Sequence, residues 1–305
     1  MNRESVDWRG YIPAVTTPFT AGLELDRDGW PAQLDWLLAE RMHGIAVAGT
    51  TGEWFSLTAP ERIELFRSAA GHVAGRMTVL AGCNAFTPGE VIGYARAALE
   101  AGCDGILLTP PPYIVPSRAE VVAWYRAVSD AVPIPICVYN WPRGTGVDLD
   151  PATLRELAAL EHVVAVKNST GDATLFVDGL IAVGDDVRYF GAPMNELGIR
   201  LMREHGLDGT IGAGAVLGAD HADFFNHAWA GDTEAALACG ARDRILFDHW
   251  INPDYSPRFG SAQAIMKAAL ELLGVPAGPP RPPLLPLAPD EVERVRATLV
   301  ELGLV

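Results

Sequence analysis

The sequence has few cysteines and no long apolar run. Its four cysteines, Cys83, Cys103, Cys137 and Cys239, lie far apart and form no Cys-x-x-Cys pair. This spacing argues against a disulfide framework and a thiolate zinc site, so we expect four small buried hydrophobic side chains. No segment offers about 18 consecutive apolar residues, and the N-terminus lacks the apolar centre of a signal peptide. We therefore expect a cytoplasmic protein.

Positive charge is also scarce. The 305 residues include 23 Lys and Arg against 38 Asp and Glu, which gives a net charge of −15. The basic residues are scattered, and this argues against nucleic acid or an anionic membrane as a partner. An anionic small-molecule substrate would have to be bound by local donors that act against the overall negative field. Hydrophobic residues make up 49% of the chain, which is enough to fill a large core.

Short apolar runs recur through the first two thirds of the chain. There are eight: Ile12–Thr16, Gly44–Ala48, Met77–Ala81, Gly105–Leu108, Pro135–Tyr139, Val163–Lys167, Val187–Phe190 and Gly209–Gly212. Runs this uniformly apolar are typical of parallel strands that helices cover on both faces. Segments with helical periodicity separate them. Eight such units predict a closed (β/α)8 TIM barrel ahead of an open doubly wound sheet, because no run resembles an exposed edge.

Three expected helix starts share the pattern of a capping box, a hydroxyl residue followed three positions later by glutamate. They are Thr58 with Glu61, Thr87 with Glu90, and Ser117 with Glu120. Their spacings of 29 and 30 residues match the length of one β/α unit. Asp150, directly before a proline, marks a further helix start.

The barrel is expected to end near residue 230. We expect residues 1–230 to form the (β/α)8 catalytic barrel and residues 231–305 a C-terminal helical domain. Helical stretches are predicted at 233–252, at 261–274 and from Asp290 onward. The proline-rich segment 276–283 predicts an extended connector across the domain surface, and a ligand for an aromatic groove is the alternative.

Lys167 lies at the end of an otherwise apolar, β-branched run. Burying it as a cation would be costly, so its amine either reaches water or stays neutral and reactive. A neutral amine can add to the ketone of a 2-oxo acid and form a protonated imine, which acts as an electron sink. Tyr139 ends the neighbouring run and can exchange a proton, with Thr51 as a relay. A core tyrosine bonded to a backbone carbonyl is the alternative for Tyr139.

The expected strand ends carry almost no metal ligands. Only Glu53 comes near, while His221 and His227 are six residues apart and lie on different faces of a helix. We therefore expect no metal and no other cofactor. The turn Gly49–Glu53 can present amide N–H groups and hydroxyls to a carboxylate, although an ordinary tight turn has the same composition.

Together, Gly49-Thr50-Thr51-Gly52-Glu53, Tyr139-Asn140 and Lys167 resemble the dihydrodipicolinate synthase and N-acetylneuraminate lyase family of class I, Schiff-base barrels. The resemblance covers nearly the whole chain. It implies that Lys167 is the imine-forming amine and Tyr139 the general acid/base. It also implies that Thr50 and Thr51 bind the substrate carboxylate, with Thr51 relaying protons.

The resemblance further implies two roles outside this central group. Ile211 matches a residue whose carbonyl faces the substrate. Tyr113 matches a tyrosine that the family inserts from a neighbouring subunit, which implies a homotetramer built as a dimer of dimers.

One segment departs from the synthase branch of this family. That branch has an arginine where Gly144 stands, and here Arg143 comes one residue early, so Arg143 is a candidate for substrate binding. The segment Glu53–Leu57 resembles the sugar-acid dehydratases of the family. We therefore expect a carbon–carbon or carbon–oxygen lyase, an aldolase or dehydratase, acting on pyruvate or a longer 2-oxo (deoxy sugar) acid. The alternatives are dihydrodipicolinate synthase proper, a phosphosugar aldolase, and a non-catalytic 2-oxo-acid-binding or regulatory protein.

Overall fold

The computed structural model describes residues 1–305 and has eight parallel strands in one sheet, in the order β1-β8-β7-β6-β5-β4-β3-β2. The strands are β1 (Gly10–Tyr11), β2 (Gly44–Val47), β3 (Thr78–Gly82), β4 (Gly105–Leu108), β5 (Ile136–Asn140), β6 (Val163–Asn168), β7 (Arg188–Phe190) and β8 (Gly209–Thr210). Strands β1 and β8 pair directly, and Ala14 just after β1 bridges Ala46 of β2. The sheet therefore closes on itself, and the predicted (β/α)8 barrel is confirmed.

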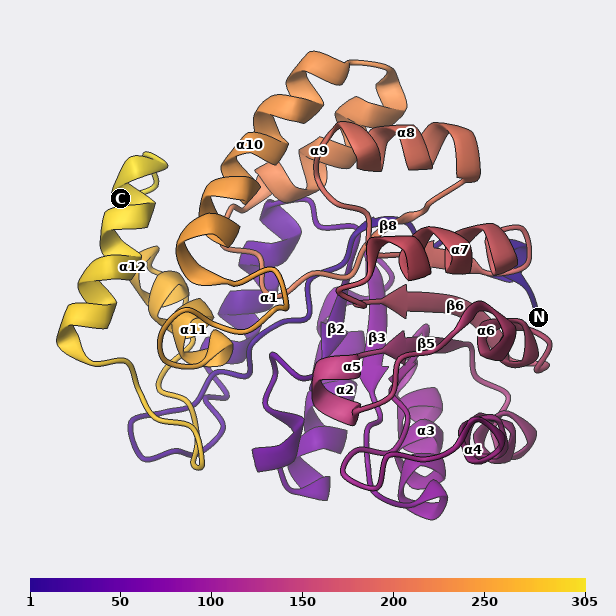
Figure 1. The fold of residues 1–305 in the computed structure, drawn as a ribbon. Coiled ribbons are helices and arrows are strands. Elements are labelled where there is room, and N and C mark those ends of the chain that lie inside the picture. Colours follow the sequence, from indigo (N-terminus) through magenta and orange to yellow (C-terminus); the bar gives the residue numbers. More distant parts are fainter.

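One long helix follows each strand and packs outside the cylinder (Figure 1). These helices are α1 (Gly29–Ala39), α2 (Ala59–Val73), α3 (Pro88–Ala101), α4 (Arg118–Ala131), α6 (Pro151–Ala158), α7 (Ala173–Val183), α8 (Glu196–His205) and α9 (Ala219–Ala230). The short helices η1 (Arg3–Ser5), η2 (Trp54–Ser56) and α5 (Pro142–Thr145) lie in the connections. All three capping boxes are present as predicted, and the side chain of Asp150 caps α6.

The first strand differs from its prediction. The run Ile12–Thr16 was expected to form it, but β1 lies two residues earlier, at Gly10–Tyr11. Pro13 has no N–H group to contribute to a ladder of hydrogen bonds, but its carbonyl accepts the N–H of Ala46 at 2.8 Å. Backbone hydrogen bonds nevertheless continue through the predicted run: Ala14 donates to Gly212 on one side, and Val15 donates to Ala46 of β2 on the other.

The barrel has two layers of apolar packing. Side chains that fill the inside of the cylinder form one cluster, which includes Trp8, Ile12, Leu107, Cys137 and Tyr139. A larger cluster fills the space between the strands and the surrounding helices. All four cysteines are free and buried, as predicted. Tyr139 therefore projects into the cylinder from β5 rather than into the outer layer.

Three more helices follow the barrel: α10 (Thr233–Trp250), α11 (Ala262–Leu272) and α12 (Pro289–Glu301). They match the three predicted stretches and pack around a cluster that includes Trp250, Ile265 and Leu299. In Figure 1, α11 and α12 lie at the left of the molecule, on the side away from the N-terminus. Residues 276–283 have no helix or strand, and Ala277 is fully buried. No helix combines the length and hydropathy that crossing a bilayer would require.

Candidate active site

Lys167 and Tyr139 lie side by side at the C-terminal ends of neighbouring strands. Strands β5 and β6 run parallel, with the Cα atom of Tyr139 paired with that of Lys167. The Nζ atom of Lys167 lies 3.9 Å from the centroid of the Tyr139 ring. Lys167 is only 6% exposed. The structure thus brings together the amine and the phenol that the sequence singled out.

The amine of Lys167 is desolvated and lacks a countercharge. Burial lowers the pKa of Lys167 to about 8, and no carboxylate opposes that shift. The group that does oppose it is the thiol of Cys137, but burial raises the pKa of Cys137 to about 12, so this thiol is neutral near pH 7. With a pKa of about 8, roughly one tenth of the amine is unprotonated at pH 7. Lys167 can therefore act as a nucleophile near neutral pH.

Tyr139 carries a phenol that stays protonated. Burial raises the pKa of Tyr139 well above its ordinary value, while hydrogen bonds with Ser169 and Thr50 oppose that rise. Thr50 therefore lies close to this phenol from the turn after β2, and the proton relay expected at Thr51 stays a prediction. Ser169 was missed, although its position two residues after Lys167 was a usable signal.

A buried amide network fixes the ends of strands β5, β6 and β7. The Nδ2 atom of Asn140 donates to Oδ1 of Asn168 at 2.9 Å and to Asp148 at 2.6 Å. Asn168 in turn donates to the hydroxyl of Tyr189 at 2.6 Å. Because Asn140 follows Tyr139 and Asn168 follows Lys167, this network holds the register that places the amine beside the phenol.

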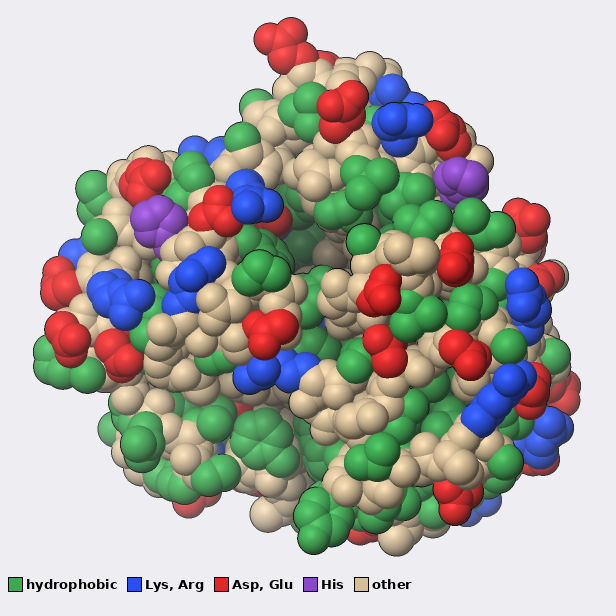
Figure 2. Space-filling view, viewed as in Figure 1, with side chains coloured by type: hydrophobic (Ala, Val, Ile, Leu, Met, Phe, Trp, Pro, Cys, Tyr) green, Lys and Arg blue, Asp and Glu red, His purple; other side chains and the backbone are tan.

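A single large cavity of about 1070 Å³ opens beside these residues. Figure 2 shows the hollow near the centre of the molecule. Six of the predicted site residues line it: Thr50, Thr51, Tyr139, Arg143, Lys167 and Ile211. Tyr113 does not line it, because it lies 90% exposed on the loop between β4 and α4, with a left-handed φ of 79°. The exposed side chain cannot serve the cavity of its own subunit from that position.

In the segment after β5, the indole of Trp141 occupies the space that a side chain at position 144 would need. A Cβ atom added at Gly144 would lie 2.3 Å from Cδ1 of Trp141. The ring of Trp141 stacks on Tyr139 at a centroid distance of 5.9 Å and meets the ring of Tyr255 at 6.0 Å. Arg143 lines the cavity and lies 3.5 Å from the carboxylate of Asp254. Sequence reasoning missed Tyr255, because it lies more than 110 residues from Tyr139 and carries no local motif.

The cavity wall includes the side chains of His221, Asp243 and Asp248. No group of three or more His, Cys, Asp and Glu side chains has an arrangement that could hold a metal ion. Glu53 is fully buried and lies 2.7 Å from the amine of Lys267. His221 stacks on Tyr11 and approaches Asp243 at 3.3 Å. Each of these side chains has its own partner within the fold.

Comparison with known proteins agrees with this geometry. The model of the dihydrodipicolinate synthetase family matches residues 7–302. The 4-hydroxy-tetrahydrodipicolinate synthase of Moorella thermoacetica is 34% identical, over 98% of this chain and all of that protein. Two solved structures have a TM-score of 0.86, with 97% of this chain and 99% of theirs covered: the Cyanidioschyzon merolae dihydrodipicolinate synthase with lysine bound (30% identical) and the Acinetobacter baumannii enzyme complexed with pyruvate (27%). The chain belongs to the dihydrodipicolinate synthetase family and is a class I, Schiff-base-forming lyase.

Proposed function

We propose that Lys167 forms an imine with the ketone of pyruvate or a longer 2-oxo acid. The nitrogen lone pair attacks the carbonyl carbon, the carbonyl oxygen leaves as water, and the protonated C=N bond then accepts electrons from a neighbouring bond. The observation that carries the proposal is a 6% exposed lysine with a pKa of about 8, in contact with a phenol at the C-terminal end of a barrel. This end of the barrel is where TIM-barrel enzymes place their chemistry. The chemistry needs no metal and no other cofactor.

The neighbouring residues divide the remaining tasks. Tyr139 is the general acid/base, since its phenol is protonated at neutral pH and lies next to the amine. The hydroxyl of Thr50 passes protons to Tyr139. Thr50, Thr51 and the N–H groups of their turn bind the substrate carboxylate, and the carbonyl of Ile211 faces the substrate across the cavity.

The cavity supports a substrate larger than pyruvate. At about 1070 Å³, with Arg143 on its wall, it has room and a cation for a second polar group. We propose that Arg143 binds this second polar group of the substrate. In this view it does not replace the arginine that the synthase branch carries at the position of Gly144. Position 144 cannot hold an arginine while Trp141 keeps its place, because even a Cβ atom there would clash with the indole. This favours a lyase or dehydratase of a longer 2-oxo acid over dihydrodipicolinate synthase proper.

The exposed loop at residues 113–115 supports assembly into an oligomer. Tyr113, Ile114 and Val115 are 90%, 65% and 57% exposed, and Tyr113 and Val115 have left-handed backbones. A strained, apolar, exposed segment is a feature that a partner subunit would cover. We propose that Tyr113 reaches into a neighbouring subunit of a cytoplasmic homotetramer.

Trapping with borohydride tests the proposed function. The protein is incubated with pyruvate and a panel of longer 2-oxo acids, the imine is reduced to a stable secondary amine, and the modified peptide is identified by mass spectrometry. The expected result is one adduct on Lys167 and none in Lys167→Met. An intact protein that gains no adduct with any oxo acid, or gains it on another lysine, contradicts the proposal.

A further inference from the structure

Glu53 is a fully buried carboxylate at the end of the turn that carries Thr50 and Thr51. Its backbone is left-handed, with a φ of 57°. Both carboxylate oxygens are held: Oε1 lies 2.7 Å from Nζ of Lys267, and Oε2 accepts the backbone N–H of Arg281 at 2.8 Å. The mechanism proposed above gives no task to this carboxylate. Its two partners come from the C-terminal extension, more than 200 residues away along the chain.

Lys267 reaches Glu53 from helix α11 and is itself only 1% exposed. Its amine also donates to the carbonyl of Pro279 at 2.9 Å and lies 4.1 Å from the ring centroid of Phe19. A buried ion pair is weak grounds for stability, because the cost of removing both charges from water can exceed their attraction. Such a pair does, however, allow one geometry only, since each charge must keep its partners.

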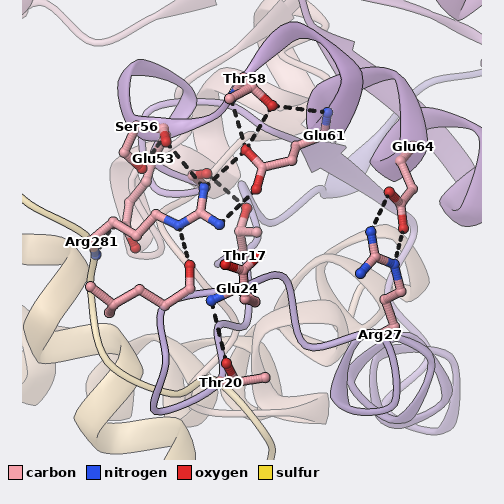
Figure 3. A network of polar contacts seen from close by, with 12 residues as sticks. Thr17, Thr20, Glu24, Arg27, Glu53, Ser56, Thr58, Glu61, Glu64 and Arg281 are labelled. Atoms are coloured by element: carbon pink, nitrogen blue, oxygen red, sulfur yellow. Dashed lines mark hydrogen bonds and ion pairs between the residues drawn. The ribbon is translucent and has the colours of Figure 1, made fainter.

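Arg281 fixes the same place from the other side, within residues 276–283, here called the strap. Figure 3 shows its guanidinium directed at Glu61, with Nη2 2.6 Å from Oε1, and its Nε donates to the carbonyl of Leu23 at 2.7 Å. The guanidinium of Arg281 lowers the pKa of Glu61 to about 2, so this contact persists at all ordinary pH values. The backbone N–H that Arg281 gives to Glu53 is therefore held in position by its own side chain.

Helix α11 contacts the turn at a second point. The Nε2 atom of Gln263, one helical turn before Lys267, donates to the carbonyl of Thr50 at 3.0 Å. The same carbonyl accepts the N–H of Glu53 at 3.2 Å, which closes the turn. Thr51 thus lies between two anchored residues, Thr50 and Glu53.

We propose that Glu53 and Lys267 are positioning residues, which hold the hydroxyls of Thr50 and Thr51 in place to bind the substrate's carboxylate. This inference rests on the function proposed above. An error of about 1 Å in a group that orients substrate can cost a hundredfold in rate, so an anchor of this kind has a direct use. The C-terminal extension, which supplies Lys267 and the strap, thereby becomes part of the active-site scaffold.

A double substitution separates positioning from stability. Removing one partner would leave a buried, unpaired charge and destabilise the protein, whereas E53Q/K267M removes both charges and keeps the side-chain volumes. The amide oxygen introduced at position 53 could still accept the N–H of Arg281. The expected result is an unfolding midpoint close to wild type together with a pyruvate concentration for half-maximal trapping raised about tenfold, while the limiting rate changes less than about threefold. Concentration series of borohydride trapping give both quantities.

Asp208→Asn is the matched control. Asp208 is also buried, and its carboxylate pairs with Arg188 at 2.9 Å. Arg188 begins β7, so this ion pair lies at the end of the barrel opposite to the cavity. We expect this variant to lower the unfolding midpoint and to leave the half-maximal concentration of pyruvate unchanged. Gln263→Met is the second test variant, because it removes the bond to Thr50 from a half-buried position on the cavity wall and adds no buried charge; we expect about a threefold rise in the half-maximal concentration of pyruvate.

The outcomes are distinct. Wild-type half-maximal concentrations in both E53Q/K267M and Gln263→Met overturn the inference, and so does an equal rise in Asp208→Asn, which would indicate general loosening. If E53Q/K267M does not fold, Gln263→Met alone decides. A wild-type protein that forms no adduct overturns the proposed function, and this inference falls with it.

Discussion

Replacing Lys167 by methionine should stabilise the protein while removing its proposed chemistry. Methionine keeps most of the side chain's length and lacks the amine. The pKa of Lys167 falls from an ordinary value of 10.5 to about 8 because burial disfavours the cation. A shift of about 2.5 units corresponds to roughly 3 kcal/mol of free energy of unfolding. The cation–π contact with Tyr139, at 3.9 Å, offsets about 0.5–2 kcal/mol of this cost of burying the cation. We therefore expect Lys167→Met to be more stable by about 1–3 kcal/mol at pH 7.

The difference in stability between Lys167→Met and wild type should depend on pH, and the lowered pKa of Lys167 sets the direction of that dependence. Below pH of about 8 both the folded and the unfolded chain carry the protonated amine, and the folded state bears the full penalty of burial. As pH rises from about 8 to 10.5, the folded state loses its proton first, so wild type gains stability relative to the variant. Above about 10.5 the amine is neutral in both states and the penalty vanishes.

Urea unfolding of wild type and Lys167→Met at pH 7 and at pH 10.5 measures this difference in stability. The midpoints can be compared when both proteins show the same slope of unfolding free energy against urea concentration. Lys267→Met provides the contrast at pH 7, since its loss leaves the buried carboxylate of Glu53 without its cation and should destabilise the protein. A Lys167→Met variant that is less stable than wild type at pH 7, or a difference that does not narrow toward pH 10.5, would refute the desolvation of this amine.

The geometry of the site supports three further predictions. The rate of trapping on Lys167 should rise about tenfold per pH unit up to pH of about 8 and then level off, because only the neutral amine adds to the ketone; a rate that is flat from pH 6 to 8 contradicts this. Tyr139→Phe should slow the exchange of pyruvate methyl protons with deuterium, followed by NMR, by about 10²–10⁴-fold while trapping on Lys167 still occurs, whereas an unchanged exchange rate would remove Tyr139 from the mechanism. Gly144→Ala should lower the free energy of unfolding by about 1–3 kcal/mol through its clash with Trp141, and adding Trp141→Ala should cancel part of that loss; strictly additive effects in urea unfolding would show that the two positions are independent.

Much of the fold could be predicted because each element has a local cause. The hydroxyl and glutamate pairs at Thr58, Thr87 and Ser117 specify helix starts whatever lies around them, and they appear as expected. The first regular strand begins two residues before the predicted run Ile12–Thr16, although backbone hydrogen bonds to both neighbouring strands continue through that run. The division at residue 230 stays a prediction; α9 and α10 pack against each other across it.

The site was predictable where two strands carry it and not where distant segments meet. Lys167 and Tyr139 each end a recognisable run, and strand register alone makes them neighbours. Tyr255, Gln263 and Lys267 reach the cavity or its supporting turn only because the C-terminal extension folds back over the barrel. No periodicity or motif encodes that return, so their contribution emerges only from the tertiary structure.

The close packing of Gly144 on Trp141 also bears on how this chain could have diverged from its relatives. A side chain cannot be added at position 144 while the indole of Trp141 keeps its place, so we expect the two sites to be epistatic. An evolutionary path from a side chain at 144 to the present arrangement must have emptied that position before, or together with, the arrival of the indole. Swapping both residues at once is therefore the natural unit of change for anyone who wishes to retrace or reverse that divergence in the laboratory.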